Sequence, residues 1–228
     1  MRNMLSILKK VLGKSHMCNC SYSQEGEDIL LNRIIGDINF KGSFVDIGAH
    51  HPVKYSNTYK FYQAGWRGIN IEANPGSMKA FNEIRPEDIN IEMPVSDREE
   101  ELTFYMFNHP ELNTFSRTQA LDWDGKFDVR LREERKLKTS TLNKILKENS
   151  PGRNEFDLLS IDVEGMDLRI IKSIDFSEIK FRFIIAEDEL NDIVNVTEGE
   201  MFQYLTSRGY RLVSKLFYSS IYQLDERP

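Results

Sequence analysis

Four apolar stretches of the sequence each end at or beside a carboxylate, and these side chains are the first candidates for chemistry. The stretches end in Asp46-Ile47-Gly48, Ile71-Glu72-Ala73, Ser160-Ile161-Asp162 and Ala186-Glu187-Asp188. Ligands of open α/β sheets bind at the carboxyl ends of the strands, so we expect these four ends to share one rim. Carboxylates gathered at a rim repel one another, so they need a cation or hydroxyl donors between them.

The first of these ends does not carry a dinucleotide motif. Residues 44–59 read FVDIGAHHPVKYSNTY, with His-His-Pro where a glycine-rich cradle would have further glycines. Gly48 has no side chain and lets a ligand approach the backbone. Glu72, one strand further on, has the position of an acid that holds ribose hydroxyls. A ribose-binding acid without a pyrophosphate cradle predicts an adenosine ligand without phosphates, such as S-adenosylmethionine. The alternative is that Asp46 and Glu72 only cap helices.

Apolar runs alternate with helical patterns along most of the chain, which predicts strands alternating with helices. Such alternation implies an α/β fold with a mostly parallel, Rossmann-like sheet covered by helices on both faces, closed by an antiparallel C-terminal hairpin. The predicted strands cover residues 43–47, 69–72, 89–93, 101–107, 156–162, 181–187, 210–217 and 219–224.

Residues 109–138 are less regular. Their charged run LREERKLK, residues 131–138, predicts a solvated helix face. His109 and Asn113 are candidates for a lid over an acceptor. Trp123 is a candidate for stacking on a ligand, and packing is its alternative.

Composition limits the domain organisation and the partners. The 228 residues, 40% of them hydrophobic, suffice for one sizeable core, so we expect one domain over residues 21–228 with an extension over residues 1–20. The net charge of −6 argues against a nucleic-acid partner. Cys18 and Cys20 stand too close together for an unstrained disulfide, and no zinc-ligand spacing accompanies them, which favours plain thiols in a reducing cytosol.

The N-terminal segment MRNMLSILKKVLGKS has apolar residues at helical spacing with basic residues between them. One interpretation is a basic amphipathic helix in peripheral contact with the inner membrane face. The other is a helix packed on the domain, or a frayed tail. No run reaches the roughly 20 apolar residues that span a bilayer, so a cytoplasmic protein is expected.

Three segments together resemble the FkbM-type family of S-adenosylmethionine-dependent methyltransferases. They are SQEGED, VDIGAHHPVKYSNTYKFYQAGWRGINIEANP and LLSIDVEGMDLRIIKSIDF, within residues 22–188. The resemblance implies the class I methyltransferase fold with a seven-stranded sheet. It also implies O-methylation of a small-molecule or glycan acceptor, such as a surface polysaccharide, a glycolipid or a glycosylated metabolite. Alternatives are a non-catalytic cofactor-fold module and a nicotinamide-dependent dehydrogenase or epimerase. The missing glycine-rich turn after the first predicted strand counts against the dehydrogenase or epimerase.

The resemblance also implies which residues meet the cofactor. Gln24 would close over it, Glu72 would hold the ribose, and His50 is the weakest match. The full implied set is Gln24, Asp46, Gly48, Ala49, His50, Asn57, Thr58, Glu72, Ala73, Asn74, Ser96 and Asp97.

Methyl transfer from a sulfonium needs an aligned acceptor oxygen and removal of its proton. The predicted catalytic residues are Asp162, His51 and Glu164. Asp162 and Glu187 end neighbouring predicted strands, so they are also candidates to hold Mg²⁺ or another divalent cation. The alternatives are that Glu164 only begins a helix and that His51 hydrogen-bonds within its loop. The sequence leaves the acceptor and the oligomeric state open.

Overall fold

The computed structural model describes residues 19–37, 39–188 and 193–225. The N-terminal basic segment and Cys18 lie outside these residues. Among the helices described, none is long and apolar enough to cross a membrane.

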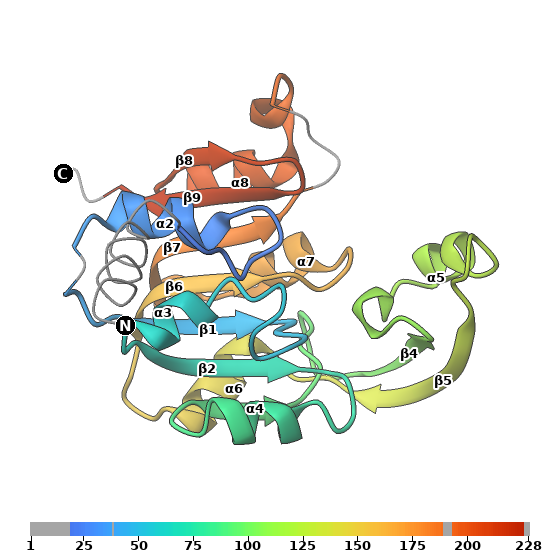
Figure 1. Ribbon diagram of the computed structural model, residues 1–228. Coiled ribbons are helices and arrows are strands. Elements are labelled where there is room, and N and C mark those ends of the chain that lie inside the picture. Colours follow the sequence, from blue (N-terminus) through green and yellow to red (C-terminus); the bar gives the residue numbers. More distant parts are fainter. Residues whose placement is uncertain (1–18, 38, 189–192, 226–228) are drawn as a thin grey trace, which may run out of the picture.

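A seven-stranded sheet with the strand order β3-β2-β1-β6-β7-β9-β8 forms the centre of the molecule (Figure 1). The first five strands in that order run parallel, and β9 pairs antiparallel with both β7 and β8. This confirms the predicted α/β class and the C-terminal hairpin. The strands are β1 (Ser43–Ile47), β2 (Arg67–Glu72), β3 (Ile89–Glu92), β6 (Glu155–Ile161), β7 (Lys180–Glu187), β8 (Tyr210–Lys215) and β9 (Ser219–Leu224).

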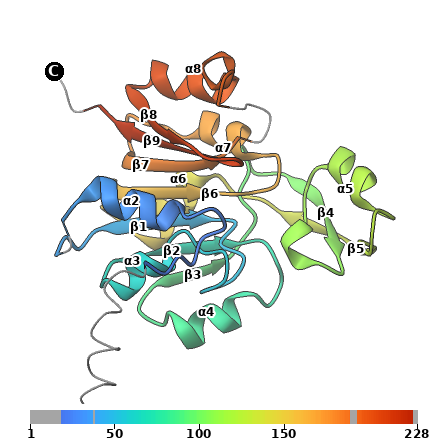
Figure 2. The same ribbon diagram turned by 45° about the horizontal axis from the view of Figure 1, so that its top comes forward.

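Helices cover both faces of this sheet (Figures 1 and 2). Successive strand residues point to opposite faces, so each strand contributes to two cores. Val45 of β1 belongs to the core that includes α6, α7 and α8, whereas its neighbour Phe44 belongs to the core with α2 and α3. The helices are α2 (Glu27–Ile35), α3 (Tyr59–Gln63), α4 (Met78–Ile84), α6 (Leu142–Asn149), α7 (Asp167–Ser173) and α8 (Glu200–Ser207), with the short 3-10 helix η3 (Val196–Glu198) before α8.

A two-stranded ribbon extends from the carboxyl end of the sheet, and we call residues 101–138 the arm (Figures 1 and 2). It consists of β4 (Glu101–Phe107), the 3-10 helix η2 (Pro110–Leu112), α5 (Arg117–Trp123) and β5 (Leu131–Lys138). The predicted helix over LREERKLK is wrong, because this run is β5. Its residues pair antiparallel with β4, from Glu101 opposite Lys138 to Phe107 opposite Leu131. Most of β5 is exposed, so no apolar alternation marks it as a strand.

Candidate active site

A cavity of about 480 Å³ lies where β1, β2 and β6 end, and the arm forms its outer wall. Seven residues of the predicted site line it, which are Gln24, Gly48, His50, Glu72, Ala73, Asp162 and Glu164. Three of the four predicted strand ends thus meet at this cavity, as expected for a parallel sheet, whereas Glu187 of the fourth lines a small recess beside it.

Gly48 fixes the contact between the ends of β1 and β6. Its φ is +75°, and a Cβ placed there would lie 1.7 Å from the carbonyl oxygen of Asp162. Its N–H donates to the carbonyl of Ile71 in β2 (3.0 Å). The glycine is therefore required by the neighbouring backbone as well as by any ligand.

Non-glycine residues with a left-handed backbone are concentrated at this cavity. Among the described residues, four non-glycine residues have positive φ, and three of them line the cavity: His50 at +49°, Tyr55 at +57° and Glu164 at +51°. Each such conformation costs about 1–3 kcal/mol and is typical of functional sites. The strained backbone is a second, independent indication that this cavity is the functional site.

The carboxylate of Glu72 is fixed at the end of β2 by backbone groups. Oε2 accepts a hydrogen bond from the N–H of His50 (2.8 Å), and Oε1 accepts one from the N–H of Asn74 (2.8 Å). Burial raises the pKa of Glu72. A carboxylate has about four acceptor positions, so Glu72 can still accept from a hydroxyl of a ligand.

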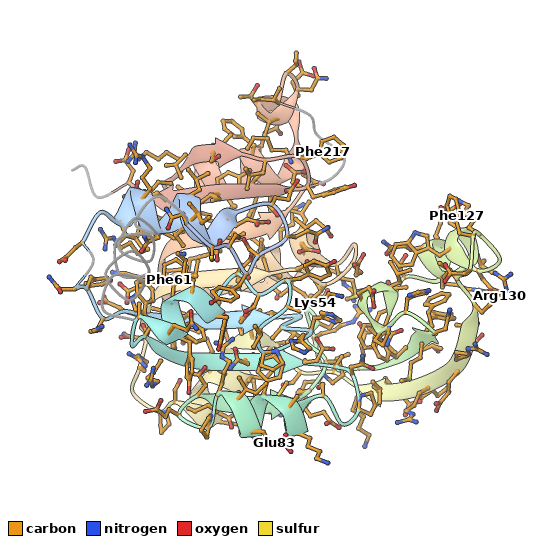
Figure 3. All side chains as sticks on the ribbon, in the orientation of Figure 1. Lys54, Phe61, Glu83, Phe127, Arg130 and Phe217 are labelled. Carbon is orange, nitrogen blue, oxygen red and sulfur yellow. The ribbon has the colours of Figure 1, made fainter. Side chains whose placement is uncertain are left out.

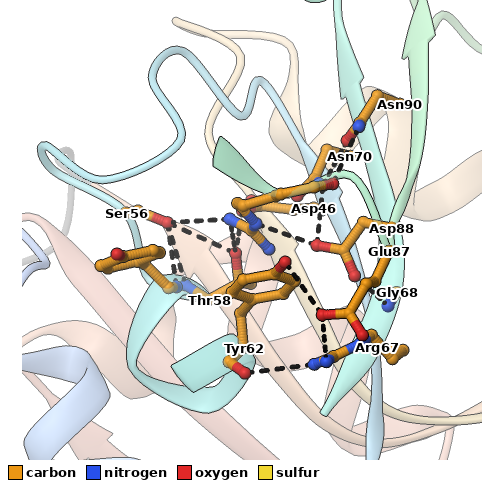
Figure 4. A network of polar contacts seen from close by, with 12 residues as sticks. Asp46, Ser56, Thr58, Tyr62, Arg67, Gly68, Asn70, Glu87, Asp88 and Asn90 are labelled. Carbon is orange, nitrogen blue, oxygen red and sulfur yellow. Dashed lines mark hydrogen bonds and ion pairs between the residues drawn. The ribbon is translucent and has the colours of Figure 1, made fainter. Parts of the chain in front are cut away.

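Asp46 and Thr58, predicted to meet the cofactor, lie behind the cavity in a buried polar network (Figure 4). The Thr58 hydroxyl donates to Asp46 (2.6 Å) and accepts from Nη1 of Arg85 (3.0 Å). Nε of Arg85 pairs with Asp88 (2.9 Å), and both side chains are fully buried. Burial raises the pKa of Asp46. This network joins β1, α3 and α4 beneath the site. Asp46 and Thr58 therefore support the site from behind the cavity.

Three other predicted cofactor residues also lie outside the cavity wall. Ala49 is buried against Met78 and Phe81. Ser96 is buried and donates to Asp97 (3.1 Å), whose carboxylate pairs with Arg169 (2.5 Å). That ion pair lowers the pKa of Asp97.

Two cofactor candidates remain close to the cavity. Asn74 contacts the arm, since its Oδ1 accepts from Nδ2 of Asn113 (3.1 Å). Asn113 lines the cavity, as its prediction in a lid suggests. Asn57 donates to the hydroxyl of Ser160 (3.2 Å) and lines a small recess beside the cavity.

The predicted catalytic residues separate into two groups. Asp162 and Glu164 line the cavity, and Glu164 accepts from the side chain of Gln119 in α5 (3.3 Å). His51 does not line the cavity. Its Nδ1 accepts hydrogen bonds from the N–H groups of Val53 (3.0 Å) and Lys54 (2.9 Å) in its own loop. Burial lowers the pKa of His51. This geometry favours the alternative in which His51 holds its own loop.

The comparison with protein families identifies the family of this chain. The model of the methyltransferase FkbM domain matches residues 46–212, which include the end of β1, the whole of β2 and β6, and the arm. The chain belongs to the FkbM methyltransferase family. No curated protein sequence matches it. A solved structure from Haemophilus influenzae, a "putative methylase", is similar at 11% identity and a TM-score of 0.42, over 89% of this chain and 90% of that one. At that TM-score the similarity supports no conclusion about this chain.

The arm contributes residues to the cavity of this methyltransferase that were not predicted from the sequence. Apolar side chains form much of the wall, and Phe104, Leu112 and Phe115 come from the arm. Met93, Val95 and Met166 come from segments outside the arm. The two other lid and stacking candidates lie elsewhere: His109 pairs with Asp128 (2.9 Å), and Trp123 packs edge-on against Phe107.

The metal prediction finds no support in the methyltransferase. Among the residues that the structure describes, no group of three or more His, Cys, Asp or Glu side chains is arranged to hold a metal ion. Asp162 follows β6 and Glu187 ends β7, and both line the same small recess.

Asp167, the first residue of α7, should make stability depend on pH. Its side chain is buried, its Oδ1 lacks a hydrogen-bond partner among the described residues, and burial together with the Asp162 carboxylate raises its pKa well above 3.8. The folded state thus binds this proton more tightly than the unfolded state. Stability is therefore lost as the pH rises from the unfolded pKa through the raised one.

We expect Asp167→Asn to raise the urea midpoint relative to the wild type at about pH 7, and this gain to vanish near about pH 3, where the carboxyl is protonated in both states. Asp122→Asn, on the exposed side of α5, is the control and should change little at either pH. An unchanged or lower midpoint for Asp167→Asn at neutral pH would contradict the assignment.

Proposed function

We propose that this methyltransferase transfers the methyl group of S-adenosylmethionine to a hydroxyl of a sugar. The observation that carries the proposal is the makeup of the cavity. Four carboxylates line it, from Glu72, Glu111, Asp162 and Glu164, and no lysine or arginine is among its described lining residues. A sulfonium cation suits such a wall, whereas the pyrophosphate of a dinucleotide would meet neither cations nor a glycine-rich cradle.

The cavity offers a matching group for each part of the donor. The fixed Glu72 carboxylate would accept the ribose hydroxyls, and the apolar side of the wall would take the adenine. The methionine end would then lie toward Gly48 and Asp162. When bound, the sulfonium supplies a methyl group that is already activated for displacement.

The chain must then position the acceptor oxygen and take its proton. Asp162 is the carboxylate at the end of β6, central in the sheet, and it lines both the cavity and the adjoining recess. An acceptor hydroxyl between Asp162 and the methyl group would lose its proton to this carboxylate. Glu164 is the second carboxylate within the same wall.

Glu72→Ala should weaken binding of S-adenosylhomocysteine by about 100-fold, because the ribose hydroxyls would lose their acceptor and hydrogen bonds to a charged group contribute ~1.5–3 kcal/mol each. Titration calorimetry measures this directly. Glu83→Ala, on the exposed side of α4, is the matched control and should bind normally. Normal affinity in Glu72→Ala would mean that the ribose lies elsewhere.

Sugars are the acceptors that the family resemblance implies, and the mouth of the site has suitable chemistry. Tyr55 is half exposed there, beside carboxylate and amide side chains. The test is transfer of a labelled methyl group to a panel of glycosides, with the product analysed by mass spectrometry and NMR. A methyl ether on a sugar supports the proposal. Transfer only to nitrogen, carbon or sulfur would contradict it.

A further inference from the structure

Two adjacent residues of the arm contact opposite sides of the cavity. Nδ2 of Asn113 donates to Oδ1 of Asn74, which follows β2 (3.1 Å). The hydroxyl of the next residue, Thr114, donates to the backbone carbonyl of Glu164, which follows β6 (3.1 Å). In the sheet, β1 lies between β2 and β6, and Gly48 comes directly after β1. Asn113 and Thr114 therefore connect the two strand ends that flank Gly48.

The arm itself holds this pair of residues in place. Tyr105 of β4 and Thr114 form an antiparallel bridge with two backbone hydrogen bonds (2.9 and 3.2 Å). Thr114 is buried between the ribbon and the cavity wall. The far end of the arm, by contrast, stands away from the sheet and carries Phe127 and Arg130 (Figure 3). The segment beside the cavity is thus fixed both to the ribbon and to the ends of the sheet strands.

A backbone donor fixes the orientation of the Asn113 side-chain amide. Its Oδ1 accepts a hydrogen bond from the N–H of Phe107 (2.7 Å), a group that can only donate. Nδ2 is therefore the atom that faces Asn74. An amide nitrogen carries two N–H groups, and Asn74 accepts from one of them. Asn113 lines the cavity, and its second N–H has no partner among the described residues.

The Asn113 amide stands among apolar side chains of the cavity wall. Leu112 precedes it and Phe115 follows two residues later, and both line the cavity together with Phe104 of β4. The donor arrangement proposed above puts the adenine against these apolar side chains. The ring nitrogens of adenine accept hydrogen bonds and do not donate them. An acceptor buried among apolar groups is costly unless a donor meets it. An N–H at this place is what the base needs.

No other side chain of the wall is placed equally well to donate to the base. Ser96 and Asp97, which the family resemblance implies near the cofactor, do not line the cavity. Among the described lining residues, three have a side-chain N–H: Gln24, His50 and Asn113. Gln24 also lines the recess at the ends of β6 and β7, and His50 follows the end of β1. Asn113 is the one that the arm places beside its apolar residues.

We propose that Asn113 recognises the base of the methyl donor: its second N–H donates to a ring nitrogen of the adenine, while Asn74 and Phe107 hold the amide in place. Asn113 is then a specificity-determining residue of the donor site, and not part of a lid over the acceptor. The inference rests on the proposed function, because it names a contact to the donor of that same reaction.

The experiment uses titration calorimetry of the full chain with S-adenosylhomocysteine and its 1-deaza, 3-deaza and 7-deaza analogues, in which a C–H group replaces one ring nitrogen. In the wild type, one analogue should bind about tenfold more weakly than S-adenosylhomocysteine and the other two nearly normally, because a single hydrogen bond is lost. Asn113→Ala should bind S-adenosylhomocysteine about tenfold more weakly and should no longer distinguish the analogues. Asn32→Ala, on the exposed side of α2, is the control and should keep both the affinity and the preference.

Asn113→Asp separates recognition of the base from folding of the arm. Its carboxylate still accepts from the N–H of Phe107 but has no N–H to donate, so this variant should lose the preference as well. A purely structural role of Asn113 would weaken binding of all the analogues equally and leave the preference among them unchanged.

The outcomes separate the two proposals. A wild type that binds all the analogues equally, or an Asn113→Ala that keeps the preference, overturns the contact to the base and leaves the methyl-transfer proposal standing. Failure of the wild type to bind S-adenosylhomocysteine contradicts the proposed function itself. The comparison of analogues within the wild-type protein needs no variant, so it decides the matter even if a variant does not fold.

Discussion

Asp162→Asn is expected to lower the rate of methyl transfer by about 10²–10⁴-fold, the usual contribution of a general base. Asparagine has nearly the same shape as aspartate, so the acceptor and donor should still bind. It cannot take the proton of the acceptor hydroxyl, however. The rate is measured in single turnover with a glycoside that the labelled-methyl screen identifies.

Stability distinguishes this catalytic effect from damage to the fold. The carboxylate of Asp162 raises the pKa of the buried Asp167, so removing its charge relieves a repulsion. Asp162→Asn should therefore be at least as stable as the wild type in urea while binding S-adenosylhomocysteine normally. Asp122→Asn is the matched surface control. An active Asp162→Asn would remove Asp162 from the mechanism.

Gly48→Ala should destabilise the protein by more than about 3 kcal/mol, which is above the usual range for a single substitution. Two effects combine at this position. The backbone is left-handed, at φ +75°, and the new Cβ would lie 1.7 Å from the Asp162 carbonyl oxygen. That contact is with backbone, which cannot move away without separating the ends of β1 and β6. The donor site should be lost together with the stability.

Gly76→Ala provides the control that separates these two effects. Gly76 has a similar φ of +83°, but nothing lies within 4 Å of its Cβ position. Gly76→Ala should lower the free energy of unfolding by only about 1–2 kcal/mol, the penalty of the left-handed backbone alone. Urea unfolding of both variants gives the comparison. Equal costs would show that the approach of Asp162 to Gly48 is not as close as described.

The fold was predictable where strands are buried on both faces. Most residues of β1, β2, β6 and β7 are buried, and Ile, Leu, Val and Phe are frequent among them, so the positions and order of these strands along the chain follow from the sequence. The arm was not predictable in the same way. Its strand β5 is almost wholly charged and exposed, and only its pairing with β4 makes it a strand.

The site was predictable at the level of strand ends and less so for side-chain directions. Glu72 and Asp162 line the cavity because they stand at the ends of parallel strands. Asp46 stands at such an end too, but it shares the face of Phe44 by the two-residue period of a strand and so joins the buried network. Arg85 could not be placed in the site from the sequence, because Asp88 is three residues away but Thr58 reaches it only in the fold.

The most direct test of the central claim is titration calorimetry of the full chain with S-adenosylmethionine, S-adenosylhomocysteine and NAD. The cavity has an acid for a ribose at Glu72, carboxylates for a sulfonium, and no described lysine or arginine for a pyrophosphate. We therefore predict that the two adenosyl amino acids bind, each at one site per chain, and that NAD does not. Tight binding of NAD, or no binding of S-adenosylmethionine, would contradict the account.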